Sequence, residues 1–281
     1  MRIIRSLILL ICLAGACHTA RAELFAGVAK SDISAEEESI RVNDPIYSKV
    51  IVFDDGETQL AIVAMDVTAI GGIGEVGDDF LPKLRERIEV ELGIPGENVL
   101  VNASHNHPPI RFVCDRYDQV SRTFDAVKRA YENRIPVKVG AGSGFEDRIS
   151  MNRTLQLKDG KAWTIRHTNP CPPDEEVESV GTMDPEIGVL RVDRMDGTPL
   201  AVVHNFACHP YITVPMGGVT ADFPGFSCQT IEENLEGDAM ALFLQGAGGD
   251  ITSILYKDVN RPRDSEPLGR MLGLSTLKAV R

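Results

Sequence analysis

Histidines stand at the ends of two apolar runs that have the length and composition of strands. Residues 99–103 lead directly to His105 and His107, and residues 200–209 end at His209. Side chains alternate along a strand, so residues two apart share a face. Two imidazoles placed in this way can bind one metal ion, or one can bind the metal while the other contacts a substrate. A packing role for such a pair is the alternative.

Carboxylates occur at comparable positions. Asp66 closes the apolar run 60–65, Asp222 follows Thr220 and Ala221, and Asp250 follows a pair of glycines. One such residue alone is typical of a turn or cap. Together with the histidines they form a nitrogen and oxygen donor set that borderline and hard cations bind. A metal held there would activate water, so the pattern predicts a metal-dependent hydrolase.

Two further features could support this chemistry. The glycine-rich residues 246–253 would let the backbone approach a ligand, with Thr252 or Ser253 presenting a hydroxyl, although a tight turn is the alternative. Arg153 could bind a carboxylate or an oxyanion, or form a surface ion pair. His204 lies inside its apolar run and is predicted to be packed. The sequence has no Gly-x-Ser-x-Gly and no His-Glu-x-x-His, which disfavours the α/β-hydrolase and zincin classes.

The elements that must position these residues are strands mixed with a few helices. Turn signals predict one hairpin from 50–53 and 60–65 and another from 187–192 and 200–209. Further strands are predicted at 99–103, 136–140 and 239–244, and helices at 80–92, 120–131, 227–236 and 268–281. Strict alternation of strand and helix is missing. We therefore predict an α/β fold with a mixed β-sheet core and flanking helices in a single domain.

The first 22 residues have the pattern of a secretory signal. Arg2 and Arg5 precede the apolar residues 7–14, and Ala20-Arg21-Ala22 resembles a cleavage site. We predict a signal peptide at 1–22, a mature domain at 23–281, and a secreted or periplasmic location. Lipid anchoring at Cys17 is the less favoured alternative. No later apolar run approaches the ~18 residues of a transmembrane helix.

Charge and cysteine content narrow the functional classes. The net charge is −12, and removal of the leader with its three arginines would make it more negative, which argues against a nucleic-acid partner. Cys114, Cys171, Cys208 and Cys228 are widely spaced, without the pairs of a zinc ribbon. An exported chain permits disulfides, and four cysteines allow three pairings.

Two segments stand apart from this pattern. Residues 166–184 form a proline-containing acidic stretch that predicts a long loop, either a functional cover or disordered. Residues 268–281 predict a helix without a stop signal, as expected for a piece of a longer protein.

Five motifs, in order, resemble those of the neutral/alkaline (non-lysosomal) ceramidase family in its N-terminal catalytic domain. Residues 26–33 (AGVAKSDI) are similar to its G-x-x-x-x-D-I-T, and 102–109 (NASHNHPP) to its S-A-T-H-T-H-S-G-P. Residues 152–154 (NRT) are similar to N-R-S, 205–209 (NFACH) to F-A-x-H, and 245–252 (QGAGGDIT) to Q-x-N-x-G-D-V-S. The order of the motifs extends the resemblance over most of 23–281.

The resemblance implies a zinc-dependent hydrolase that cleaves the amide bond of an N-acyl sphingosine with an activated water. By it, His105 and His209 would be zinc ligands and His107 would bind or polarise the substrate amide. Arg153 would support the catalytic site, and Thr252 stands where the family has a catalytic serine. The implied partner is a small-molecule or lipid amide substrate.

The sequence departs from the family pattern at several positions. Pro108, Pro109 and Ile110 stand where the family has Ser-Gly-Pro. The family takes two further zinc ligands, a Glu and a Tyr, from sequence that would lie beyond Arg281. Asp66 or Asp222 could substitute for one of them. The alternatives are a metal-dependent hydrolase of another acylated substrate, such as a sugar amide or an ester, and a non-catalytic ceramidase-like binding domain.

Overall fold

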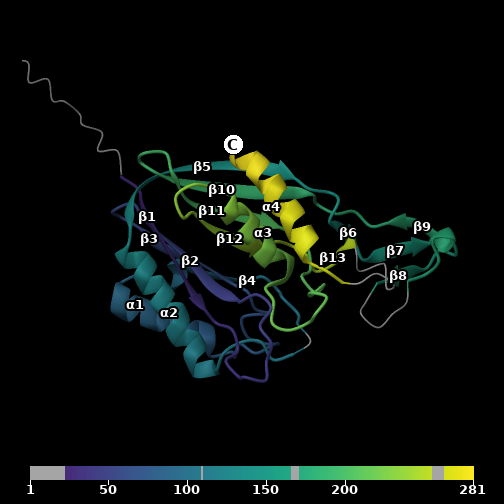
Figure 1. Cartoon of the computed structure of the whole chain (residues 1–281), viewed down its shortest axis with the longest axis horizontal. Coiled ribbons are helices and arrows are strands. Elements are labelled where there is room, and N and C mark those ends of the chain that lie inside the picture. The colour runs from purple at the N-terminus through teal and green to yellow at the C-terminus, as the bar shows by residue number, and fades with distance from the viewer. Residues whose placement is uncertain (1–22, 109, 166–170, 255–262) are drawn as a thin grey trace, which may run out of the picture.

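A mixed sheet of eight strands runs through the molecule (Figure 1). The computed structural model describes residues 23–108, 110–165, 171–254 and 263–281. The predicted signal peptide, Cys17 and Pro109 lie outside these residues. The sheet contains β1 (Phe25–Asp32), β2 (Tyr47–Asp54), β3 (Gln59–Met65), β4 (Val99–Ala103), β5 (Ile135–Phe145), β10 (Glu186–Arg194), β11 (Pro199–Phe206) and β12 (Met240–Gln245).

Its strand order is β12-β11-β10-β5-β1-β2-β3-β4. The pairs β3–β4 and β11–β12 are parallel, and the other pairs are antiparallel. Both predicted hairpins are present, as β2–β3 and β10–β11. The α/β fold with a mixed sheet and flanking helices is therefore confirmed. Small sheets are formed by β6 (Ser150–Asn152) with β13 (Ile251–Ser253), and by β7 (Thr154–Leu157), β8 (Ala162–Thr164) and β9 (Val177–Val180).

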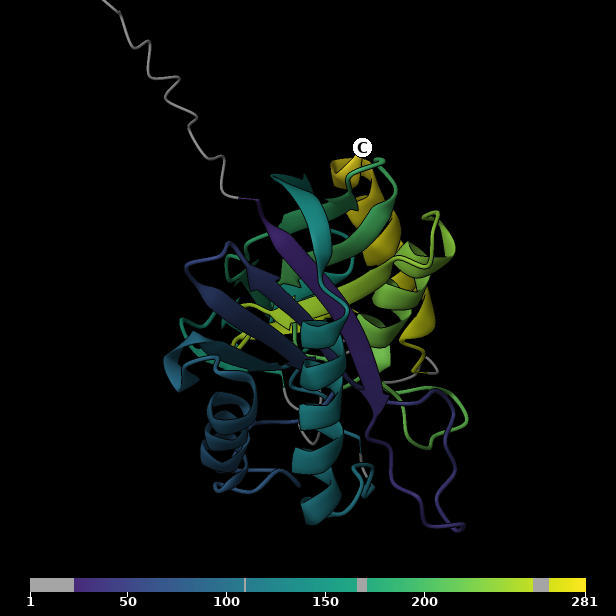
Figure 2. The same cartoon turned by 90° about the vertical axis from the view of Figure 1, so that its left-hand side faces the viewer.

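Alternating side chains divide the apolar core into three clusters. From β2, Val50 and Val52 pack with α1 (Phe80–Leu92) and α2 (Arg116–Glu132). The intervening Ile51 and Phe53 pack instead with apolar residues of β11 and β12. The other face of β11 and β12 packs against α3 (Asp222–Glu233) and α4 (Glu266–Val280). The strands therefore lie between two helix pairs, which Figure 2 shows well apart.

The sheet bends back on itself where β1 meets β5. These strands share only the pairs Phe25 with Pro136 and Ala26 with Ile135, whereas β1 and β2 pair along their whole length. The bend brings together the two strands at the ends of the strand order. Asn102 of β4 accepts the backbone N–H of Gln245 of β12 at 2.8 Å, and its own amide donates to the Gln245 carbonyl at 3.3 Å. The ends of β4 and β12 thus meet at one edge.

Several element ends differ from the predictions. Helix α1 has the predicted bounds and ends at Gly93, which adopts φ 75°. Helix α2 begins four residues earlier than predicted, because the Asp115 side chain caps it by accepting the N–H of Tyr117. Helix α3 likewise begins earlier, at Asp222. Strand β11 ends at Phe206, so the prediction that it reaches His209 is wrong, and the predicted loop 166–184 contains β9.

Close backbone packing explains one glycine of β1. A Cβ atom on Gly27 would lie 2.0 Å from the carbonyl oxygen of Ala130 in α2. The helix can therefore approach the strand only where a side chain is absent.

His204 and three of the cysteines are buried inside the molecule. His204 is fully buried on β11, and its Nε2 lies 2.8 Å from the hydroxyl of Ser227, which confirms that it is packed. Cys114, Cys208 and Cys228 are buried free thiols. In the described part of the chain, no helix has both the length and the apolar character needed to cross a bilayer.

Candidate metal centre

His105, His107 and His209 converge although about a hundred residues separate the first two from the third. Each offers one ring nitrogen, and the three nitrogens lie within 4.8 Å of one another. The ring centroids of His105 and His209 are 4.7 Å apart, and those of His105 and His107 are 4.3 Å apart. A tetrahedral zinc ion holds ligand nitrogens ~3.4 Å apart, so small side-chain adjustments would suffice.

His105 is positioned by the loop that follows β4. The N–H groups of His105 and Asn106 both donate to the carbonyl of Val67, which fixes this loop against the end of β3. Asn106 is fully buried and donates from its side chain to the Thr220 carbonyl at 2.5 Å. His105 itself adopts φ 67°, an unfavourable conformation for a residue with a side chain. Such strain is concentrated at functional sites.

His209 is positioned by the glycine-rich segment after β12. Its N–H donates to the carbonyl of Ile251 at 3.0 Å, and its Nδ1 lies 2.5 Å from the carbonyl oxygen of Gly248. A Cβ atom on Gly248 would come within 3.0 Å of the backbone nitrogen of Cys208. Glycine at this position therefore lets the loop lie close enough to hold the histidine. The glycine-rich segment thus comes close to another part of the backbone, as predicted, and this approach orients the side chain of His209.

The hydrogen bonds of the rings fit a metal ligand set. The Nδ1 atom of His105 lies 2.7 Å from the Thr68 carbonyl oxygen. A carbonyl oxygen only accepts, so Nδ1 carries the proton in His105 and in His209, and each neutral ring keeps its Nε2 lone pair for a metal. Burial is the largest cause that lowers the pKa of His209, and this favours the neutral, ligating form.

The predicted carboxylates do not join the cluster. In the described part of the chain, the three histidines are the only group of three or more His, Cys, Asp or Glu residues whose ligand atoms lie within 4.8 Å of one another. Asp222 is buried, and its two oxygens accept the N–H groups of Thr213 and Phe223. Asp250 accepts the side-chain amide of Asn152 at 2.9 Å. Asp66 faces a different cavity. Each acid is therefore held by its own local contacts, which the sequence pattern could not distinguish.

Arg153 and Thr252 lie beside the histidines and are linked through Tyr211. The Tyr211 hydroxyl donates to Oγ1 of Thr252 at 2.7 Å and is also hydrogen bonded to Arg153. The charge of Arg153 also acts on His209. Thr252 is fully buried, so its hydroxyl faces Tyr211 rather than solvent. Burial raises the pKa of Tyr211, which keeps it a hydrogen-bond donor at neutral pH.

A cavity of about 330 Å³ opens beside His105 and His209. Its other lining residues are small or polar: Thr68, Ala69, Asn102, Ala103, Gln245, Gly246, Gly248 and Gly249. No large apolar side chain is among these lining residues. A neighbouring cavity shares Gly246 and contains the carboxylates of Asp184, Glu186 and Asp250. The space next to the histidines thus suits polar groups.

Sequence reasoning missed two residues of this centre. Tyr211 follows His209 by two positions and lies 5.1 Å from it between ring centroids, and the His-Pro-Tyr order was an available signal. Gln245 donates to the carbonyls of Ser104 and Cys208, one beside each histidine loop. A single glutamine at the end of a strand gives no comparable signal in the sequence.

The fold is a mixed α/β domain of the type found in ceramidases. The chain is similar to a crystal structure of neutral ceramidase from Pseudomonas aeruginosa, with a TM-score of 0.68 and 17% identity over 92% of this chain and 45% of that chain. It is also similar to a structure of a ceramidase complexed with C2, with a TM-score of 0.70 and 16% identity over 92% of this chain and 44% of that one.

The chain therefore spans less than half the length of these two ceramidases. At this identity the likeness is one of fold. No protein-family profile matches the sequence, and no curated protein sequence matches it. The predicted resemblance to ceramidases is thus confirmed by three-dimensional structure.

Proposed function

We propose that this chain forms the metal-binding part of an exported zinc-dependent hydrolase, which cleaves the amide bond of an N-acyl sphingosine-like lipid. One observation carries the proposal: His105, His107 and His209 meet in a domain with the ceramidase fold. The leader pattern of residues 1–22 supports export, and amino-terminal sequencing of the protein from an exporting host would test it, with Glu23 as the expected first residue.

The residues of the centre take distinct roles in this proposal. His105 and His209 hold zinc through Nε2, with their Nδ1 protons fixed by the carbonyls of Thr68 and Gly248. Zinc in such a site acts as a Lewis acid and lowers the pKa of water. His107 binds the substrate carbonyl or amide. Arg153 and Tyr211 stabilise negative charge that develops on the substrate oxygen.

Thr252 is assigned a positioning role. Its buried hydroxyl accepts the Tyr211 proton and so fixes the tyrosine ring beside His209. Because the ceramidase family has a catalytic serine at the position of Thr252, the resemblance suggested that Thr252 contacts the substrate. The buried side chain supports an action through Tyr211 instead.

Incubation with zinc and an N-acyl sphingosine tests the activity. We expect fatty acid release by the wild type, loss of release in His105→Ala and His209→Ala, and retained release in His204→Gln, because His204 lies outside the centre. Zinc content is measured on the same samples. Bound zinc at one ion per chain, without release of fatty acid, would contradict the lipid amidase proposal. Absence of bound zinc would favour the non-catalytic binding domain.

A second candidate function is hydrolysis of a polar acylated substrate, such as a sugar amide or an ester. The lining of the cavity beside His105 and His209 favours it, because Thr68, Asn102 and Gln245 offer hydrogen bonds and no large apolar side chain offers a surface for an acyl chain. A panel of N-acyl sugars and short esters, compared with an N-acyl sphingosine, separates the two. Turnover of the polar panel alone, abolished by His105→Ala, would favour the second candidate.

A further inference from the structure

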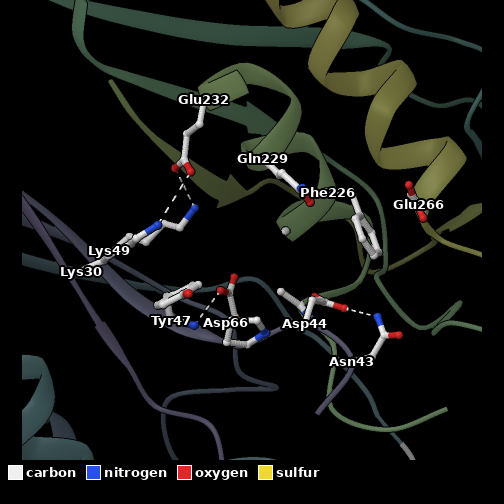
Figure 3. A pocket seen from close by; sticks show the side chains of 13 residues that line it. Lys30, Asn43, Asp44, Tyr47, Lys49, Asp66, Phe226, Gln229, Glu232 and Glu266 are labelled. Carbon is white, nitrogen blue, oxygen red and sulfur yellow. Dashed lines mark hydrogen bonds and ion pairs between the residues drawn. The ribbon is translucent and has the colours of Figure 1, made fainter. Parts of the chain in front are cut away.

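A group of charged residues outside the histidine centre surrounds a cavity of about 460 Å³ between β2, α3 and the loop before β2 (Figure 3). No residue that lines it also lines the cavity beside His105 and His209. This cavity is therefore a separate space in the molecule.

The positive charges of this cavity gather at one carboxylate. The ammonium group of Lys49 lies 3.3 Å from Glu232, and that of Lys30 lies 3.8 Å from the same residue. Lys49 also donates to the carbonyl of Ala241 at 3.0 Å. Figure 3 shows both lysines directed toward Glu232. Both ammonium groups thus lie beside Glu232.

Two further carboxylates line the cavity, and the charge of Lys49 acts on one of them, Asp66. Asp66 is nine-tenths buried, and one of its oxygens accepts the N–H of Tyr47 at 2.9 Å. Asp44 accepts the N–H of Ala221 and the side-chain amide of Asn43. Neither aspartate forms an ion pair with any residue that the structure describes. In Figure 3 the Asp66 carboxylate points into the open space below α3. A buried carboxylate in this position is stabilised by a cationic partner.

The arrangement fits an organic cation better than a metal ion. In the described part of the chain, the acids of this cavity do not form a group with ligand oxygens close enough for one metal. The volume is also far larger than one ion needs. Polar groups of Asn43, Tyr47 and Gln229 line it beside the ring of Phe226, so the lining suits hydroxyl groups next to the charge.

We propose that this cavity is a second binding site, which holds a small hydroxylated primary amine, such as an amino sugar or amino alcohol, with its ammonium group against Asp66. The ammonium donates to the free Asp66 oxygen, and the hydroxyl groups bond to the polar side chains of the wall. The site does not depend on the metal chemistry of the histidine centre.

Calorimetric titration of the full chain with glucosamine tests the site. We expect saturable binding of one glucosamine per chain and at least tenfold weaker binding of N-acetylglucosamine and glucose, which lack the charge. Asp66→Asn keeps the shape and the acceptor for Tyr47 but removes the charge, so we expect it to weaken binding at least tenfold. Gln229→Trp at the exposed edge of the cavity should block it without disturbing the core. Glu86→Gln, exposed on α1, is the matched charge control and should bind normally.

A pH series gives a second readout. Burial raises the pKa of Asp66 to about 6, with Lys49 and the Tyr47 backbone acting against this and Asp44 and Glu232 acting with it. Glucosamine should therefore bind more weakly as pH falls through 6 in the wild type. Absence of saturable binding, equal binding of the neutral sugars, or equal binding by both cavity variants and the wild type would overturn the proposal. Displacement of glucosamine by millimolar magnesium or calcium would overturn it in favour of a metal site.

Discussion

Removal of one histidine should abolish zinc-linked stabilisation of the fold. A ligand that binds only the folded state stabilises it by about 2.7 kcal/mol when its concentration is 100 times its Kd. For a domain of this size each kcal/mol raises Tm by roughly 2–4 °C, so saturating zinc should raise Tm of the wild type by about 5–10 °C. The geometry behind this estimate is the set of three ring nitrogens within 4.8 Å.

The variants His105→Ala and His209→Ala each remove one of the two histidines assigned to zinc, so only one assigned ligand remains beside His107. Zinc sites in proteins use three or four ligands, so the loss of either histidine should leave too few to hold the ion. We expect the zinc-induced rise in Tm to disappear in both variants. His204→Gln is the matched control, since it removes a histidine that lies under α3, bonded to Ser227, and leaves the centre intact.

Differential scanning calorimetry with zinc and with a chelator measures the rise. Each variant is compared with itself, so any loss of intrinsic stability cancels. The control should lose stability but keep the rise of about 5–10 °C. A rise that persists in His105→Ala and His209→Ala would refute the reasoning, because the ion would then bind elsewhere.

Three other perturbations follow from the structure. Burial lowers the pKa of His204 to about 3, so only the unfolded state takes up a proton at this residue as pH falls below 6.5. Between pH 7 and pH 5 this proton uptake lowers the free energy of unfolding by about 2 kcal/mol. Denaturant titrations should show a smaller loss of stability over this pH range in His204→Gln. Tyr211→Phe leaves the buried Thr252 hydroxyl without its donor, and we expect about 1–3 kcal/mol lower stability with unchanged zinc content by elemental analysis. Gly27→Ala forces β1 away from α2 and should cost about 1–3 kcal/mol in chemical denaturation, whereas Gly140→Ala, with open space around it, should cost less than 1 kcal/mol.

The sequence predicted the secondary structure well where a local signal was complete. Helix α1 has the predicted bounds because its apolar spacing and its terminal Gly93 are both local features. Helix α2 was predicted too short, since its first turn is polar and is fixed by the Asp115 cap. Strand β11 was predicted too long, because an apolar run continues past the point where pairing with β12 stops at Phe206 and Gln245.

The candidate site was predicted by residue type more reliably than by arrangement. The three histidines were identified from their places after apolar runs, and they meet. Three acids also stand at the ends of apolar runs or beside turns in the sequence, but they do not join the histidine cluster: Asp66, Asp222 and Asp250. A strand end specifies that a side chain reaches an edge of the sheet. It does not specify which edge or which face.

Local sequence patterns were enough to predict the elements and the chemically capable residues, because hydrophobic periodicity, caps and turn residues act over a few positions. The meeting of β4 and β12 through Asn102 and Gln245 was not predictable in this way, because these strands lie at opposite ends of the strand order. That closure follows from burying the apolar faces of both halves of the sheet against each other, as Ile51 and Leu242 show. Such burial depends on contacts between residues nearly two hundred positions apart, which no local pattern records.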